Sequence, residues 1–198
     1  MHNKMTRRSF AKTILAAGAL GPSLAKAQEQ TAAGEMATTT SQPAAPTYIS
    51  NSFVTLDWRD YFSNLRKGAI LSDTVGRVLH YWSEEGEYLI YPTSVPLTEE
   101  LTRRGRTSIV RKVEGPEWRP TENMLRRDPD LPRYVGPGPQ NPLGTHALYL
   151  SWQYYRIHGT NDTRKIGRQA SNGCIGLYNE DIKDLFDLAK IGTQVLLV

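Results

Sequence analysis

The chain has 198 residues, of which 39% are hydrophobic, and this is enough for one domain with a buried core. Its formal charge of +4 comes from the N-terminus, because residues 1–27 contain five basic and no acidic side chains. The remaining residues carry 19 basic and 20 acidic side chains, a net charge of −1. This balance argues against the basic surface of a nucleic-acid-binding protein, and we expect no nucleic-acid partner.

Residues 1–27 have the organisation of a signal peptide. The pair Arg7-Arg8 precedes an apolar stretch at 13–20, and Ala25 and Ala27 provide the small side chains that a signal peptidase requires. The paired arginines indicate the twin-arginine export route. The apolar run is short and rich in Ala and Gly, so we expect a periplasmic protein with no stable membrane span after processing. An uncleaved amphipathic helix is the alternative.

The rest of the chain divides into a tether, residues 28–60, and one folded domain, residues 61–198. The tether begins with Ala, Thr, Gln, Ser and Pro, which cannot bury enough surface to fold, so we expect it to be disordered before it enters the domain. In the domain, short β-branched and aromatic runs separated by glycine-containing turns predict mainly antiparallel strands. These runs lie near 68–73, 77–82, 88–92, 108–113, 147–152, 154–158 and 194–198.

Residues 114–142 contain seven prolines and three glycines, which exclude a long helix or a central strand. We expect a surface excursion here, with at most one helical turn at 124–127. One helix is predicted after Asn179, which suits an N-cap and precedes apolar residues at helical spacing up to Ala189. The expected fold is mainly β, a sandwich or barrel-like sheet with one helix in the C-terminal region and a Pro-rich excursion.

Cys174 is the single cysteine of the chain. An exported protein usually pairs its cysteines in disulfides, which one cysteine cannot do within its own chain. A lone thiol in that setting is either a small buried apolar residue or is present for its reactivity. The residues around it decide between the two.

His158 and Cys174 each stand beside a glycine where a strand is predicted to end or start, in the segments RIHGT at 156–160 and SNGCI at 171–175. Their separation of 16 positions suits two neighbouring strands joined by a loop. An adjacent imidazolium lowers a thiol pKa from about 8.5 into the range of about 3.5–7.5, so we predict that a Cys174 thiolate attacks a carbonyl. His158 would then protonate the departing amine.

Other residues are predicted to support this pair. No Asp or Asn directly follows His158, so the carbonyl of Gly159 is predicted to orient its ring, with Asn161 and Asp162 as alternatives. Around the nucleophile, Ser171, Asn172 and Gly173 are predicted to shape the loop, so that main-chain amides of 172–174 face a developing oxyanion. One such donor contributes about 2.7–4 kcal/mol to the transition state.

The order of the two residues separates classes of cysteine enzyme. Papain-like and NlpC/P60-type peptidases place the cysteine before the histidine, and sortases need an arginine after the cysteine, whereas this chain has none after Cys174. The histidines at 80, 146 and 158 lack the spacing of a metal site. We therefore expect no metal.

Several short motifs follow one another along the chain and include the two segments above: PEWRP at 116–120, LP at 131–132, NPLG at 141–144, YRIHGTN at 155–161, IG at 166–167, SNGCI at 171–175 and NED at 179–181. With these motifs, the chain from Gly68 to Val198 resembles the L,D-transpeptidases of the YkuD (ErfK/YbiS/YcfS/YnhG) family.

The resemblance implies a YkuD catalytic domain and a ping-pong reaction on peptidoglycan stem peptides. Cys174 would attack the carbonyl at the L-centre of diaminopimelate in a tetrapeptide and expel the terminal D-Ala. An amine of a second stem peptide would resolve the thioester into a 3–3 cross-link, and an amine of an outer-membrane protein would anchor that protein to the wall. Carbapenems typically acylate members of this family, and the chemistry needs no cofactor.

One departure bears on specificity: Gly176 stands where most relatives carry an arginine. It leaves the acyl acceptor open and makes the first of two alternatives more plausible. One is an L,D-carboxypeptidase or amidating variant that uses the same acyl-enzyme, and the other is a catalytically silent wall-binding module. The presence of both Cys174 and His158 favours an enzyme.

Three residues are predicted to contact substrate: Trp118 in the excursion, as a lid contact, and Tyr155 and Arg156 beside His158. Trp118 has the alternative role of pinning the excursion. Arg104 and Arg127 are expected to be solvated charges. Most of the nearby aromatic side chains are expected to be core: Tyr149, Trp152, Tyr154 and Tyr155.

Overall fold

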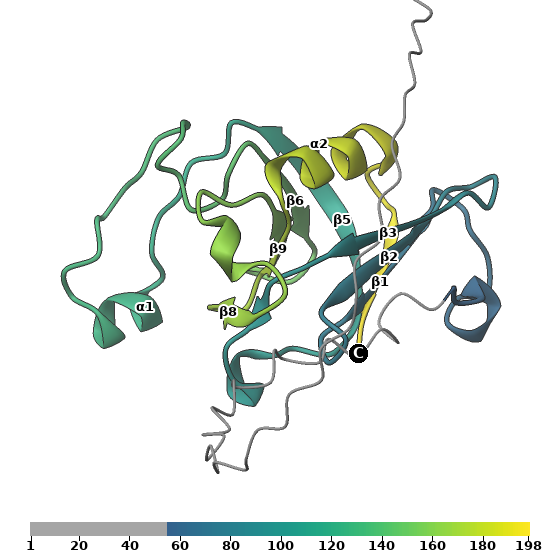
Figure 1. Cartoon of the computed structure of the whole chain (residues 1–198), viewed down its shortest axis with the longest axis horizontal. Helices are drawn as coiled ribbons and strands as arrows, with labels where there is room; N and C mark the ends of the chain where they lie inside the picture. Colours follow the sequence, from purple (N-terminus) through teal and green to yellow (C-terminus); the bar gives the residue numbers. More distant parts are fainter. Residues whose placement is uncertain (1–54) are drawn as a thin grey trace, which may run out of the picture. The chain divides into compact units, whose positions relative to one another are not determined.

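The computed structural model describes residues 55–198, which form the domain drawn in colour in Figure 1. The predicted signal peptide and residues 28–54 of the predicted tether lie outside the described residues. Near the start of the described chain, Leu56 and the short 3-10 helix η2 (Trp58–Asp60) pack against a buried cluster that includes Phe62 and Trp82. These residues thus already belong to the packed domain.

Eight strands form one curled sheet in the order β3-β2-β1-β10-β5-β6-β7-β9. The pairs β1–β10 and β7–β9 are parallel, and the other pairs are antiparallel. Two further strands, β4 and β8, form a small parallel sheet. The strands are β1 (Ala69–Asp73), β2 (Val78–Trp82), β3 (Tyr88–Pro92), β4 (Val95–Pro96), β5 (Gly105–Glu114), β6 (His146–Leu150), β7 (Arg156–His158), β8 (Gln169–Ser171), β9 (Ile175–Gly176) and β10 (Gln194–Leu197).

The first hairpins follow from local sequence. Strands β1 and β2 are almost continuously buried, as expected for central strands that are covered on both faces. They are joined by a tight turn in which Asp73 Oδ1 accepts hydrogen bonds from the N–H groups of Val75 and Gly76 at 2.9 and 2.8 Å. The predicted meander of three antiparallel strands is confirmed.

Helix α2 (Asn179–Leu188) packs on β6 and β7, and Figure 1 shows it beside β6. Ile182 and Leu185 are fully buried in the main core, together with Ile157 and Ile175 from β7 and β9. The helix stripe is therefore as predicted. The N-cap is different, because Tyr178 occupies that position and the side chain of Asn179 is used elsewhere.

The Pro-rich excursion leaves β5 and returns at β6, and Figure 1 shows it projecting with the short helix α1 (Glu122–Arg127). Thr121 caps α1, since its side chain accepts from the N–H of Met124 at 3.3 Å. Asn141 closes the excursion, because its amide donates to the carbonyls of Pro116 and Gly136 at 2.6 and 3.0 Å.

The mainly β fold is confirmed, with α1 as a second, short helix in addition to the predicted one. The strand predicted at 154–158 is wrong at its start, because β7 begins only at Arg156. Tyr154 lies in the turn after β6 with a φ of 68°, a left-handed conformation that no strand residue adopts. Within residues 55–198, no helix is long and apolar enough to cross a membrane.

Candidate active site

Two neighbouring strands, β7 and β9, bring the predicted histidine and cysteine together. They are parallel, with Ile157 beside Ile175 and His158 beside Gly176. One residue earlier in the same register, Arg156 lies beside Cys174. Side chains alternate between the faces of a sheet, so the buried isoleucines face the core while Arg156, His158 and Cys174 share the opposite face.

The His158 ring is fixed by a hydrogen bond next to it in the chain. Its Nδ1 lies 2.5 Å from the carbonyl oxygen of Gly159, which can only accept, so Nδ1 carries the proton and Nε2 is left free to accept one. Only 8% of the residue is exposed, and this burial lowers the pKa of His158 to about 4. The charges of Arg156 and Lys165 act in the same direction. The imidazole is therefore neutral at physiological pH.

The Cys174 thiol is half-buried, and its Sγ donates to the carbonyl oxygen of Tyr154 at 3.3 Å. Burial raises the pKa of Cys174, while the charge and hydrogen bonds of Arg156 oppose that rise. Burial therefore acts against the lowering of this thiol pKa that the sequence predicts. It disfavours the charged form of each group, so the site favours a neutral thiol and a neutral imidazole.

The loop before Cys174 is held by its own hydrogen bonds. Ser171 Oγ donates to the carbonyl of Cys174 at 2.5 Å and accepts from the Gly173 N–H at 3.3 Å. Gly173 has a φ of 125°, which disfavours any other residue. Arg127 reaches this loop from α1 and donates to Asn172 Oδ1 at 2.7 Å, so it is not merely a solvated charge.

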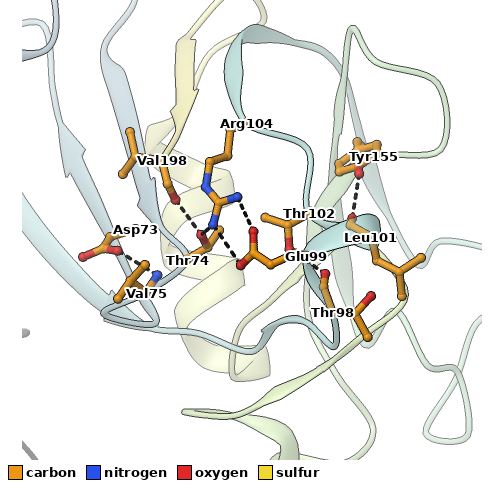
Figure 2. Close-up of polar contacts among 10 residues, drawn as sticks. All are labelled: Asp73, Thr74, Val75, Thr98, Glu99, Leu101, Thr102, Arg104, Tyr155 and Val198. Carbon is orange, nitrogen blue, oxygen red and sulfur yellow. Dashed lines mark hydrogen bonds and ion pairs between the residues drawn. The ribbon is translucent and has the colours of Figure 1, made fainter.

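A second group of contacts supports this loop as a brace, and Figure 2 shows its hydrogen bond between Tyr155 and Leu101. Tyr155 donates through its hydroxyl to the carbonyl of Leu101 at 2.8 Å, at the end of the 3-10 helix η3 (Glu99–Leu101). Arg104 forms an ion pair with Glu99 at 2.6 Å and so holds this segment. A Cβ on Gly173 would lie 3.5 Å from the Leu101 carbonyl and 3.6 Å from the Tyr155 ring, so the loop packs directly on the brace.

Asn179 locks the segment that follows the histidine. Its Oδ1 accepts from the N–H groups of Thr145 and Thr160 at 3.1 and 3.2 Å, and its Nδ2 donates to the Thr160 carbonyl at 3.0 Å. A Cβ on Gly144 or Gly159 would lie 2.1 or 2.3 Å from that Oδ1. Gly159 thus leaves room for the Asn179 side-chain amide, which holds the end of the strand that carries His158.

Gly176 lies beside Ser94, which forms a bridge to it from the start of β4. A Cβ on Gly176 would lie 2.4 Å from Ser94 Oγ and 3.9 Å from His158 Cε1, so the space next to the histidine ring is filled by serine. Arg156 is the cation with the largest effect on the reactive pair, because its charge lowers the pKa of both Cys174 and His158.

The predicted substrate residues lie in different settings. Arg156 stands beside the thiol, whereas Tyr155 packs against the core and its hydroxyl donates a hydrogen bond to the Leu101 carbonyl. Trp118 is 8% exposed and pairs through its main chain with Val135 inside the excursion. Tyr154, expected in the core, is 60% exposed next to the thiol. Among residues 55–198, no cluster of three His, Cys, Asp or Glu side chains could hold a metal ion.

Comparison with known proteins agrees with this architecture. The sequence model of the YkuD family, described as the L,D-transpeptidase catalytic domain, matches residues 67–197. The putative L,D-transpeptidase in the ATP synthase subunits region (ORF 5) of Fuscovulum blasticum is 55% identical over 162 residues, 80% of this chain and 85% of that protein. The probable L,D-transpeptidase ErfK/SrfK of Escherichia coli K12 is 37% identical over 139 residues, 68% of this chain but only 44% of that longer protein.

A solved structure shares the fold at low identity. L,D-transpeptidase 3 from Mycobacterium tuberculosis, in complex with a faropenem-derived adduct, superposes with a TM-score of 0.53 at 15% identity, over 66% of this chain and 60% of that one. The domain is thus of the L,D-transpeptidase class in its fold. The family model and the identities go further: the chain belongs to the YkuD family of L,D-transpeptidases.

Proposed function

We propose that the protein is an L,D-transpeptidase that acts on peptidoglycan tetrapeptide stems through a thioester on Cys174. The observation that carries this proposal is the row of Arg156, His158 and Cys174 on one face of β7 and β9, with the His158 tautomer fixed by the Gly159 carbonyl. Family membership supplies the reaction class. In this proposal His158 is both the general base and the general acid, and Cys174 is the nucleophile.

The proposed reaction starts from the neutral pair. His158 Nε2 takes the thiol proton as Sγ bonds to the donor carbonyl carbon at the L-centre of diaminopimelate, and Arg156 stabilises the developing negative charge on sulfur. The tetrahedral intermediate then collapses, the C–N bond breaks, and His158 returns the proton to the departing D-Ala amine. An acceptor amine attacks the thioester in the second half, loses a proton to His158 and releases the thiol.

The acceptor is proposed to be the amine of a second stem peptide, which gives a 3–3 cross-link, or an amine of an outer-membrane protein. Water as acceptor would make the enzyme an L,D-carboxypeptidase. The twin-arginine signature at residues 6–12 supports export, and we place the reaction in the periplasm, where peptidoglycan lies.

The test is mass spectrometry of the protein purified without residues 1–27. Incubation with a carbapenem or a disaccharide tetrapeptide should give a covalent adduct that is absent from Cys174→Ala and strongly reduced in His158→Gln. His146→Gln is the matched control, because His146 hydrogen-bonds to Thr145 and its ring lies tilted against that of Phe186, outside the β7–β9 row. A wild-type protein that forms no adduct with either reagent would refute the proposal. In the product mixture, dimers indicate transpeptidation and free tripeptide alone indicates hydrolysis.

A further inference from the structure

A cavity of about 510 Å³ opens beside the reactive pair, between β5, β6, β7 and the excursion. Three of its lining residues are arginines, Arg111, Arg119 and Arg156, and one is an acid, Glu117. Two tyrosines, Tyr149 and Tyr154, also line the cavity. We call this cavity the arginine pocket.

The positive charges of the arginine pocket are poorly neutralised. Glu117 approaches Arg119 only to 4.0 Å, and Arg111 and Arg156 form no ion pair with any residue in the described range. Instead, both guanidinium groups lie against Tyr149, at 3.9 Å for Arg111 and 5.1 Å for Arg156 from the ring centroid. Two cations on one ring repel each other, and a bound anion would relieve this repulsion.

Arg156 also carries an unmet hydrogen-bond donor. Its Nε is buried and has no acceptor among the described residues. A buried N–H without a partner is costly, and most such groups in folded proteins are paired. A carboxylate approaching the guanidinium side-on accepts from Nε and a terminal nitrogen together, which is the geometry that arginine favours.

The arginine pocket shares a wall with the nucleophile. Tyr154 and Arg156 line the cavity, and the thiol of Cys174 donates to the main-chain carbonyl of the same Tyr154. An anion held here would lie next to the carbonyl that sulfur attacks. We propose that the arginine pocket binds a carboxylate of the donor stem peptide, so that the enzyme selects donors in which this carboxylate is free over donors in which it is an amide.

This inference rests on the proposed function and narrows its substrate. A tetrapeptide donor offers two carboxylates close to the scissile bond, the terminal carboxylate of the leaving D-Ala and the side-chain carboxylate of diaminopimelate. Both provide the same chemistry, so the experiment uses one donor with both carboxylates free, one amidated at the terminus and one amidated at the diaminopimelate side chain.

The measurement is kcat/KM for thioester formation on Cys174. For the wild type we expect one of the two amidated donors to react roughly tenfold to a hundredfold less efficiently than the free donor, as expected for the loss of a charged hydrogen bond. The donor that shows the loss identifies the carboxylate. In Arg111→Gln, and separately in Arg119→Gln, the difference between the free and amidated donors should shrink to about threefold or less.

Arg66→Gln is the matched control, because Arg66 is exposed and does not line the arginine pocket, and it should keep the full difference. Circular dichroism checks that each variant is folded. Equal reactivity of all three donors with the wild type would overturn the inference, and so would an unchanged difference in both pocket variants. Absence of a thioester with every donor would instead refute the proposed function itself.

Discussion

The protonation state of the Cys174–His158 pair follows from burial. Desolvation acts against charge on either residue, so the pKa of the thiol is raised and that of the imidazole is lowered to about 4. Arg156 favours the thiolate but disfavours the imidazolium, so burial, the largest cause for both groups, is what opposes proton transfer before substrate arrives. Charge separation then accompanies the attack on the carbonyl.

This arrangement predicts the pH dependence of acylation. His158 accepts a proton only when neutral, so the rate of acylation by a carbapenem should fall with an acid limb near pH 4, not near 6.5. Because burial raises the pKa of Cys174, alkylation by iodoacetamide should be slower at neutral pH than alkylation of a solvent-exposed thiol and should rise only at alkaline pH. Both rates can be followed by intact mass. Fast alkylation at about pH 5, with an acid limb near pH 6.5, would show an ion pair instead.

Asn179 gives a second prediction for a single side chain. Asn179→Ala removes three hydrogen bonds and leaves the N–H of Thr160 unsatisfied, which should cost about 2–3 kcal/mol of unfolding free energy. Urea denaturation measures the cost, and acylation should slow because the strand end that carries His158 loosens. Asn123→Ala, in an exposed position on α1, is the control and should change stability by less than about 0.5 kcal/mol. An Asn179→Ala protein as stable as this control would contradict the assigned role.

Among the secondary-structure elements, η3 is far from β9 in sequence yet supports the loop before it. The Arg104–Glu99 ion pair holds η3, Leu101 accepts from Tyr155, and Gly173 packs on both Leu101 and Tyr155. The ion pair is exposed and is itself worth little. The Tyr155 hydrogen bond is the part of this brace that touches the nucleophile's loop.

Loss of that bond should affect catalysis more than substrate affinity. Tyr155→Phe keeps the ring packing but removes the hydroxyl, so we expect kcat for acylation to fall about twofold to tenfold with KM little changed. Tyr178→Phe serves as the control, since no hydrogen bond of its hydroxyl contributes to this brace. If Tyr155 instead contacted substrate directly, as the sequence suggests, KM would rise with kcat maintained.

The elements differ in how far they could be predicted. The meander β1–β3 and helix α2 follow from periodicity and turn residues that lie close together in the chain. Strands β4, β8 and β9 have only two or three residues, and their pairing depends on tertiary contacts that no local pattern encodes. The high β propensity of Tyr154 and Tyr155 predicts a strand where the structure has the turn before β7, because the left-handed backbone of Tyr154 overrides that propensity.

The site shows the same limit. The glycines beside His158 and Cys174 indicate from the sequence that both residues belong to a site, because glycine is needed where backbones approach closely. Asn179 suits a helix N-cap by type, but its amide finds three main-chain partners from two other segments, and sequence alone could not show that competition. Arg111 and Arg119 belong to no motif in the sequence, and only the sheet and the excursion bring them to one cavity with Arg156.

For the domain as a whole, the lowered pKa values of two buried histidines, His80 and His158, make stability depend on pH. His80 in β2 is 2% exposed and its ring stacks against both Trp82 and Tyr88, while His158 lies on β7 across the sheet. Burial lowers the pKa of both histidines from the ordinary value of about 6.5, to about 4 for His158. In the unfolded chain both are protonated below about pH 6.5, whereas in the fold the lowered pKa of each makes it bind its proton only at a lower pH.

The sign of the effect follows from proton linkage. Between about pH 6.5 and 4 the unfolded state binds more protons than the folded state, so the free energy of unfolding must fall as the pH is lowered through this range. His158 alone accounts for a loss of up to about 3 kcal/mol. Urea denaturation at about pH 7 and pH 5 should show the decrease, and His158→Gln should remove a large part of it while His146→Gln should not. A pH dependence that is unchanged in His158→Gln would mean that the imidazole is solvated and titrates normally in the folded protein, which would also remove the basis for a neutral catalytic pair.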